Sequence, residues 1–188
     1  MTLTKHIRFV QAALIFAIVA MPFMSLRTAV AASAEEIDRE VATALKLLYH
    51  HTPKAKELGA IAKGILVFPN IYKAGFIVGA QVGEGALLVG GKTVGYYNTV
   101  AGSYGYQAGV QKFSYAMFLM TDSTMNYFEN SRGIELGVGP SIVVVDAGKA
   151  KTLTTTTAKD DIYAFIFGQK GLMAGAGLQG SKITKINK

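Results

Sequence analysis

Histidine, the usual acid–base and metal-binding side chain, is scarce in this sequence. Only His6, His50 and His51 occur, and the last two are neighbours on a predicted helix. Adjacent helical residues point about 100° apart, so this pair cannot bind one metal ion in the i, i+4 manner. A solvated helix end beside Thr52-Pro53 is the simpler interpretation.

Other catalytic chemistry also lacks support in the sequence. The chain contains no cysteine, which excludes disulfides, thiolate nucleophiles and Cys-ligated metals. No Gly-x-Ser-x-Gly sequence supports a Ser-His-Asp triad. For Asp160-Asp161, the sequence shows no second acidic or basic residue at a spacing typical of a catalytic pair. A hydrolase would need a cleft with a perturbed catalytic group, which a sequence cannot show. We therefore expect no catalytic residue, no metal ligand, no cofactor and no enzymatic activity.

Two glycine-rich segments match nucleotide-binding loops only in part. Residues 175–180 fit the dinucleotide pattern Gly-x-Gly-x-x-Gly, but only eight residues follow, too few for the rest of a Rossmann unit. Gly91-Lys92-Thr93 ends like a phosphate loop, yet Ala86 stands where that loop needs its first glycine. We predict that this second segment is a turn between two strands.

The N-terminal segment has the order of a secretory signal peptide. Lys5 and Arg8 precede an apolar run over residues 9–26, and small residues follow. Ala-x-Ala sequences at 29–31 and 32–34 both fit a cleavage site, and the first is preferred. An uncleaved membrane anchor is the alternative, although this run is marginal against the roughly 20 apolar residues of a span.

Cleavage near residue 31 or 34 would separate a signal peptide, residues 1–31, from a single domain, residues 32–188. Loss of Lys5, Arg8 and Arg27 would leave 16 basic residues against 12 acidic ones, a net charge of +4. This charge suits an anionic lipid surface but falls short of the clustered bases of a nucleic-acid site. We expect a periplasmic or secreted protein, peripheral to the cell envelope, without a nucleic-acid partner.

The composition and the apolar periodicity predict one α+β domain. The chain of 188 residues is 51% hydrophobic and has 21 glycines, which excludes disorder. Helical spacing predicts a helix from Glu35, a second from Thr52-Pro53 through Lys63, and a mid-chain helix from Thr121 to near Asn130. Glycine-separated apolar runs predict up to ten strands, mostly of 4 to 7 residues: 65–68, 76–82, 86–89, 94–97, 104–110, 113–120, 134–138, 142–145, 162–167 and 172–178. The expected architecture is N-terminal helices packed on a Gly-rich, mainly antiparallel β-sheet or small β-barrel, with one mid-chain helix.

Glycine and glutamine share one face of three predicted strands. The alternation runs through residues 75–85, 103–111 and 173–179, with apolar residues on the opposite face. Glycine weakens a strand, so its repeated use predicts sharp bends in a closed barrel or the close approach of another element. A contact surface for lipid or protein is the alternative.

Seven segments in order resemble the SYLF lipid-binding domain family. They are 62–69 (AKGILVFP), 73–79 (KAGFIVG), 83–85 (GEG), 103–109 (SYGYQAG), 118–122 (FLMTD), 171–175 (GLMAG) and 178–181 (LQGS). The resemblance implies phosphoinositide or other anionic-lipid binding, and in some fungal relatives actin binding. Bacterial members are often exported single domains, so we carry over only the membrane-associated theme, and actin enters by family analogy alone.

Four lysines form the predicted lipid-binding site: Lys54, Lys56, Lys63 and Lys73. They lie on or near the second predicted helix and the first predicted strand. Each lysine close to an anionic membrane contributes about 1 kcal/mol of attraction. The resemblance implies that an N-terminal helical segment makes the membrane contact. Solvation of exposed faces is the alternative, and Glu57 dilutes the field of the lysines.

The leading hypothesis is a non-enzymatic, exported module that binds anionic phospholipid headgroups or associates with the envelope. A small integral outer-membrane β-barrel is one alternative, and a protein-interaction or structural domain is another. Against the outer-membrane alternative stand the predicted helices and the short strands, since a spanning strand needs about 9 to 11 residues.

Overall fold

The computed structural model describes residues 32–131, 134–135, 139–145, 158–171 and 181–188, without the side chains of residues 76–77 and 103–108. The chain divides into two units, Met1–Ala31 and Ala32–Lys188, and only the second contains described residues. The predicted signal peptide, the strand at 172–178 and the dinucleotide-like motif lie outside the described residues.

Two helices lead the domain. Helix α2, Ala34–His51, begins at Ser33, whose hydroxyl accepts a hydrogen bond from the backbone N–H of Glu36 at 3.2 Å. One face of α2 is buried and follows the predicted helical spacing: Ile37, Val41, Ala44 and Leu48. Helix α3, Pro53–Ile61, has proline in its first turn, where the missing N–H costs nothing. Both predicted N-terminal helices are therefore confirmed.

A single long hairpin follows the helices. Strand β1, Gly64–Val89, has 26 residues and pairs antiparallel with the 28-residue β2, Lys92–Leu119. Gly90 and Gly91 connect them with φ angles of +57° and +79°, the pair of positive φ values that a tight hairpin turn requires. The predicted turn between two strands is confirmed at Gly91, whereas Lys92 and Thr93 already belong to β2.

The predicted division into short strands is wrong for this hairpin. Strand β1 contains three of the predicted strands, 65–68, 76–82 and 86–89. Strand β2 contains three more, 94–97, 104–110 and 113–120, except for the last residue of 113–120. The glycines between these runs bend the strands without ending them, because backbone pairing continues across them. The strand-length argument against the outer-membrane alternative therefore loses its basis.

Strand β1 folds back on itself through its glycines. A Cβ atom at Gly75 would lie 2.8 Å from the carbonyl oxygen of Val78, and one at Gly83 would lie 2.7 Å from that of Asn70. A Cβ atom at Gly85 would clash with the carbonyl oxygen of Val67. We call this contact of β1 with itself the seam. It confirms close approach of backbone for the stretch 75–85, in this case by the same strand. For the other two predicted stretches, the side chains of residues 103–108 and all of residues 173–179 lie outside what the structure describes.

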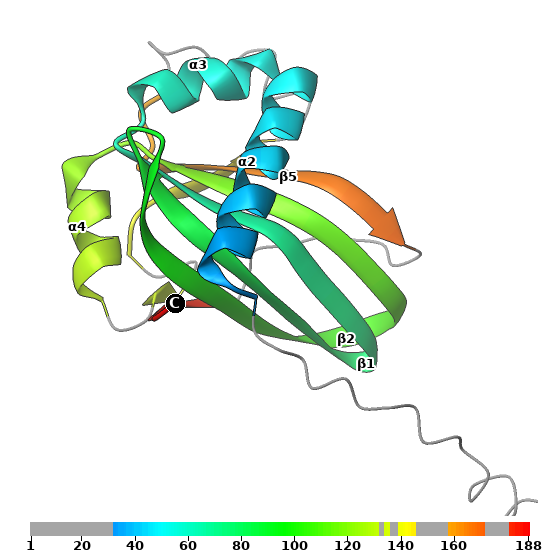
Figure 1. The fold of residues 1–188 in the computed structure, drawn as a ribbon. Coiled ribbons are helices and arrows are strands. Elements are labelled where there is room, and N and C mark those ends of the chain that lie inside the picture. Colours follow the sequence, from blue (N-terminus) through cyan, green and yellow to red (C-terminus); the bar gives the residue numbers. More distant parts are fainter. Residues whose placement is uncertain (1–31, 132–133, 136–138, 146–157, 172–180) are drawn as a thin grey trace, which may run out of the picture. The chain divides into compact units, whose positions relative to one another are not determined.

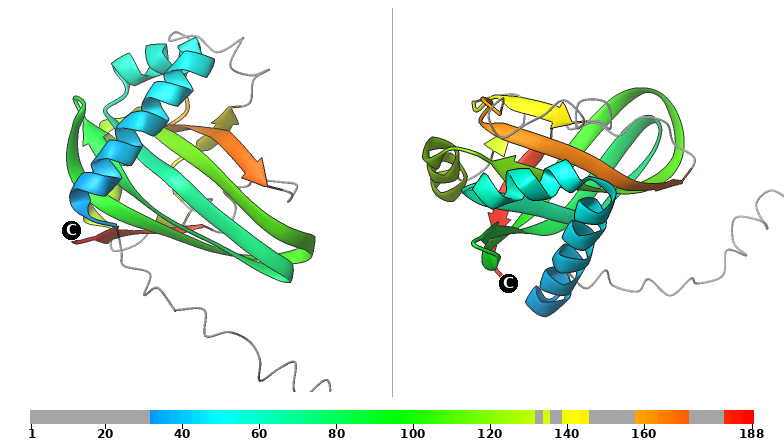
Figure 2. Two further views of the ribbon diagram at one scale, coloured as in Figure 1. Left: turned by 45° about the vertical axis from the view of Figure 1, so that its right-hand side comes forward. Right: turned by 90° about the horizontal axis from the view of Figure 1, so that it is seen from above.

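The described strands form one curled, mainly antiparallel sheet (Figures 1 and 2). Its order is β3-β6-β2-β5-β4, and β1 pairs with β2 outside this path. The shorter strands are β3 (Ile134–Glu135), β4 (Ile142–Val145), β5 (Ile162–Gly171) and β6 (Lys182–Ile186). Among the described strands, β4 and β5 form the one parallel pair. Residues 96–100 of β2 pair with β6 and residues 111–119 with β5, so the bent β2 carries both ends of the sheet.

Two apolar cores hold this arrangement. The inner one fills the curl of the sheet and includes Phe128 of α4, Asp122–Asn130. Helix α4 begins at Thr121, whose hydroxyl accepts from the N–H of Thr124 at 3.2 Å, as predicted for the mid-chain helix. The outer core lies under α2 and α3, where Val67 and Phe118 pack against both helices' buried residues. The α+β class with helices on a glycine-rich sheet is confirmed.

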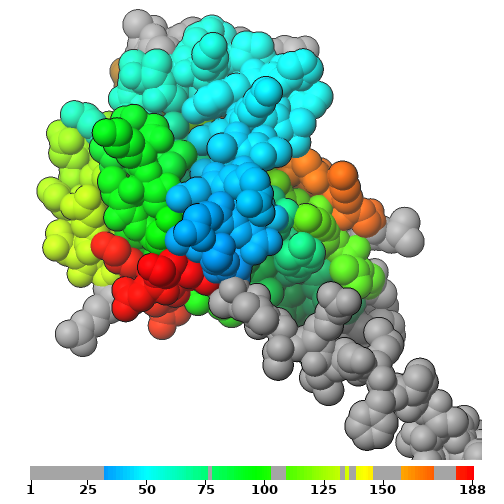
Figure 3. All heavy atoms as spheres, viewed as in Figure 1, coloured from blue at the N-terminus to red at the C-terminus, as the bar shows by residue number. Residues whose placement is uncertain are grey.

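Helix α2 lies on the surface with different neighbours on its two sides. In Figure 3 the hairpin of β1 and β2 (green) adjoins α2 (blue) on the left, and β5 (orange) lies to its right. The C-terminal residues (red) lie below its first turn. The two flanks of α2 therefore meet different parts of the sheet.

Candidate functional site

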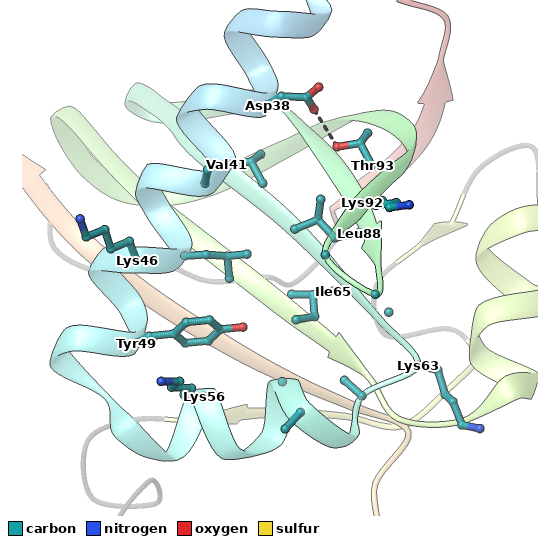
Figure 4. A pocket seen from close by; sticks show the side chains of 18 of the residues that line it. Asp38, Val41, Lys46, Tyr49, Lys56, Lys63, Ile65, Leu88, Lys92 and Thr93 are labelled. Carbon is teal, nitrogen blue, oxygen red and sulfur yellow. Dashed lines mark hydrogen bonds between the residues drawn. The ribbon is translucent and has the colours of Figure 1, made fainter.

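A groove of about 1100 Å³ lies between α2, α3 and the hairpin turn (Figure 4). Its floor is aliphatic and consists of Val41, Leu45, Ile65 and Leu88. The turn glycines Gly90 and Gly91 form part of its wall. A groove of this volume is large enough for a small-molecule ligand or for part of a lipid.

Four lysines line this groove: Lys46 on α2, Lys56 on α3, Lys63 before β1 and Lys92 at the start of β2. Figure 4 shows them around the apolar floor, with Lys46 and Lys56 on one side and Lys63 and Lys92 on the other. Lys63 lies 3.2 Å from the carboxylate of Asp122, and both side chains are largely exposed. Within the described part of the chain, the other three make no ion pair.

Asp38 is the only acidic residue among the described residues that line the groove, and its carboxylate already accepts hydrogen bonds. It accepts hydrogen bonds from the Thr93 hydroxyl at 2.7 Å and from the Tyr96 hydroxyl at 3.0 Å. Burial and the neighbouring carboxylate of Asp38 raise the pKa of Tyr96. These bonds tie α2 to the β1–β2 hairpin and close one end of the groove.

Tyr49 supplies a neutral polar group inside the groove. Burial raises the pKa of its hydroxyl, so the group stays protonated at physiological pH. The hydroxyl lies over α3, since a Cβ atom at Gly59 would approach it to 2.6 Å. It makes no hydrogen bond to any described residue, and Figure 4 shows it directed into the groove. It is therefore available to a ligand.

The structure brings together half of the predicted lipid-binding lysines. Lys56 and Lys63 line the groove, whereas Lys54 and Lys73 do not. Lys54 instead pairs with Glu57 at 2.8 Å on the exposed side of α3. Lys73 lies along β1 opposite Gln111 of β2, because β1 continues well past the segment that borders the groove.

Sequence reasoning missed Lys46 and Lys92. Lys46 precedes Tyr49 by three residues on α2, so the two share a helix face, and this spacing is a readable signal. Lys92 directly follows the turn glycines as the first residue of β2, and the sequence predicted only a turn there. Its place on the groove depends on the path of the whole hairpin, which no local pattern shows.

Further site classes can be tested against the described residues. No group of three His, Asp or Glu side chains among them is placed to hold a metal ion. None of the helices in these described segments is long and apolar enough to cross a membrane. What the described residues show is an α+β domain with a basic groove over an aliphatic floor.

Residues 100–188 match the family model Ysc84, described as Las17-binding protein actin regulator. This is the SYLF family that the seven sequence segments resemble, and the match covers slightly less than half of the chain. No curated protein matches the chain. The matched segment begins within β2, and every groove residue precedes it. Support for the groove therefore comes from the structure and not from the family match.

Proposed function

We propose that this protein is a non-enzymatic module that binds anionic phospholipid headgroups through the groove. The observation that carries the proposal is the ring of four lysines around an aliphatic floor, with one carboxylate that internal hydrogen bonds already satisfy. A lipid presents the matching chemistry, since its phosphate can meet the lysines while an acyl chain covers the floor.

Exposed apolar residues beside the groove support a lipid surface over a soluble anion. Ile61 at the end of α3 is 45% exposed, and Val94 next to Thr93 is 50% exposed. Both adjoin groove-lining residues in sequence. Apolar side chains at a basic rim suit the headgroup boundary of a bilayer. Insertion of these apolar side chains would then act together with an electrostatic attraction of about 1 kcal/mol for each lysine near the surface.

The experiment is vesicle cosedimentation of the domain from residue 32 to 188. Vesicles of phosphatidylcholine alone should bind weakly, and vesicles that also contain phosphatidylglycerol should bind tightly, less so as salt rises. Replacement of Lys46, Lys56, Lys63 and Lys92 by Gln should weaken binding by up to about a thousandfold, from about 1 kcal/mol for each lysine. A matched variant with Gln at Lys54, Lys159, Lys182 and Lys185 controls for net charge.

Two results would reject this proposal. Equal loss in the groove variant and the matched variant would mean that net charge alone drives binding. Absence of binding by the parent to any vesicle would favour a protein partner, which the family description as a Las17-binding actin regulator makes the second candidate.

We also propose export, with the domain at the periplasmic or outer surface of the envelope. The support is the basic start, the apolar run over residues 9–26 and the small residues before Glu35. Mass spectrometry of the protein isolated from its own cells should find a new N-terminus at Ala32 or Glu35. An intact Met1 on membrane-embedded protein would show the alternative, an uncleaved anchor.

A further inference from the structure

A second hollow, of about 420 Å³, lies on the other flank of α2; we call it the cleft. Its walls come from α2, β1, β2 and β5. Residues 39, 43 and 47 of α2 face it, whereas residues 38, 42, 45 and 49 face the groove. The two hollows share no lining residue, because they use opposite sides of one helix.

Like charges face each other across two strands in the cleft. Lys112 of β2 and Lys170 of β5 are direct partners in the antiparallel register, so their side chains leave the same face of the sheet. Directly opposed like charges destabilise a sheet. Arg39 of α2 lines the same cleft and adds a third positive charge.

The described residues supply little counter-charge. Glu40 is the only acid among the lining residues that the structure describes, and its Oε2 already accepts a hydrogen bond from Asn70 Nδ2 at 2.7 Å. The Lys112 ammonium lies 5.2 Å from the centre of the Tyr72 ring, which holds it without neutralising it. Within the described segments, the side chains of Arg39 and Lys170 have no hydrogen bond or ion pair.

We infer that the cleft binds a dianionic phosphate group between Arg39, Lys112 and Lys170. Three bases and one acid leave a charge of +2 on the lining, which a phosphate monoester or inorganic phosphate balances near pH 7. The Arg39 guanidinium can donate two parallel hydrogen bonds to phosphate oxygens, and the lysines act as point charges. This inference goes beyond the lipid proposal and does not depend on it.

The test measures the melting temperature of the domain in inorganic phosphate and in sodium chloride of equal ionic strength. Phosphate should raise the Tm of the parent above the chloride value, by about 3 °C when its concentration exceeds the Kd tenfold. Lys170→Gln should melt at or above the parental Tm in chloride, because it removes the opposed charge, and should lose the phosphate-specific rise. Arg39→Gln should lose that rise too.

Each other result overturns the inference. An equal rise in phosphate and chloride means an adventitious ion only, as does a phosphate-specific rise that both variants keep. If Lys170→Gln melts below the parent in chloride, then Lys170 stabilises the sheet and the opposed pair does not mark a site. The line width of the phosphate signal in ³¹P NMR provides a readout independent of folding, and it should broaden with the parent and not with Arg39→Gln.

A further experiment distinguishes a soluble phosphate ester from a lipid headgroup as the source of the phosphate group. Glycerol 3-phosphate represents a soluble monoester and phosphatidic acid vesicles a lipid headgroup. Both are applied to the variant whose four groove lysines are Gln, so that the groove does not contribute. Failure of vesicle binding by the parent would reject the lipid proposal and leave the phosphate-dependent Tm untouched.

Discussion

The seam within β1 and the two flanks of α2 are built in opposite ways. At the seam, glycine lets backbone meet backbone with no side chain between. On the flanks of α2, the described lining of the two hollows holds seven lysine and arginine side chains and two acidic ones. Sterics control the first region and electrostatics the second. We therefore expect substitutions at the seam to change stability, and those on the flanks to change binding and its dependence on salt.

The largest effect is expected for Gly85→Val at the seam. The added Cβ would clash with the Val67 carbonyl oxygen and would lie 2.9 Å from the Phe68 ring. Because these contacts belong to backbone and a buried ring, neither can move aside cheaply. We expect a loss of about 3 kcal/mol or more in the free energy of unfolding, measured by urea denaturation.

Gly102→Val is the matched control in the same hairpin. No atom lies within 4 Å of a Cβ placed there, so this variant should unfold within about 0.5 kcal/mol of the parent. Gly109→Val should be destabilised for a different reason, since Gly109 has φ of +133°, where a β-branched residue is strained. Equal stability of Gly85→Val and Gly102→Val would show that the seam is not closely packed.

The next effect concerns binding on the flank of α2. Lys46→Gln with Lys92→Gln should weaken binding to phosphatidylglycerol vesicles by about thirtyfold, from about 1 kcal/mol for each lysine. The paired control, Lys54→Gln with Lys73→Gln, removes the same charge outside the groove and should change binding severalfold at most. A similar loss of vesicle binding in both double variants would mean that Lys54 and Lys73 contribute to the binding site.

How much the sequence could predict differs between the same two regions. The glycine alternation from residue 75 to 85 correctly marked a surface of close approach, because period-two spacing is a local property of the chain. It could not show that the approaching element is β1 itself. The sequence also did not show that the short apolar runs form two long strands. Glycine between such runs is typical of a strand end, whereas here the strand bends at glycine and continues.

The basic site depends on contacts between residues distant in sequence. The sequence predicts Lys56 and Lys63 as site residues because one lies on a short helix and the other directly after it. Lys46 and Lys92 reach the same groove only through the packing of α2 on the hairpin, with Asp38 bound to Thr93 and Tyr96. The sequence already indicates that Glu57 weakens the field of the lysines, and the structure shows that it pairs with Lys54 three residues away on the same helix.

A smaller effect is expected at the contact that joins the seam to α2. The Lys188 ammonium donates to both oxygens of Glu84, at 2.9 and 3.0 Å, and to the carbonyl oxygen of Ala32 at 2.9 Å. Its side chain is only 9% exposed, and that of Glu84 is 31% exposed. Lys188→Met should therefore cost about 1.5 kcal/mol in the free energy of unfolding, between the values for exposed and buried pairs. Lys159→Met, on an exposed residue, is the control, and equal stability of both variants would contradict the prediction.

The smallest effect is expected at the hydrogen bond from Tyr96 to Asp38, which holds α2 on the hairpin. Partial burial, and then the Asp38 carboxylate, raise the pKa of Tyr96 above its ordinary value of 10.0. A raised folded-state pKa means that the contribution of Tyr96 to stability is complete below pH 10 and is lost as pH rises through the folded pKa. Tyr96→Phe removes the hydroxyl and should lower the free energy of unfolding by about 1 kcal/mol at pH 7. That difference from the parent should shrink above about pH 10, in urea denaturation across pH 7 to 11, while the loss from other buried tyrosines is common to both proteins. Tyr72→Phe keeps its ring beside Lys112 and should match the parent at pH 7. A deficit for Tyr96→Phe that stays constant to pH 11 would mean that ring packing, and not the hydrogen bond to Asp38, fixes α2 on the hairpin.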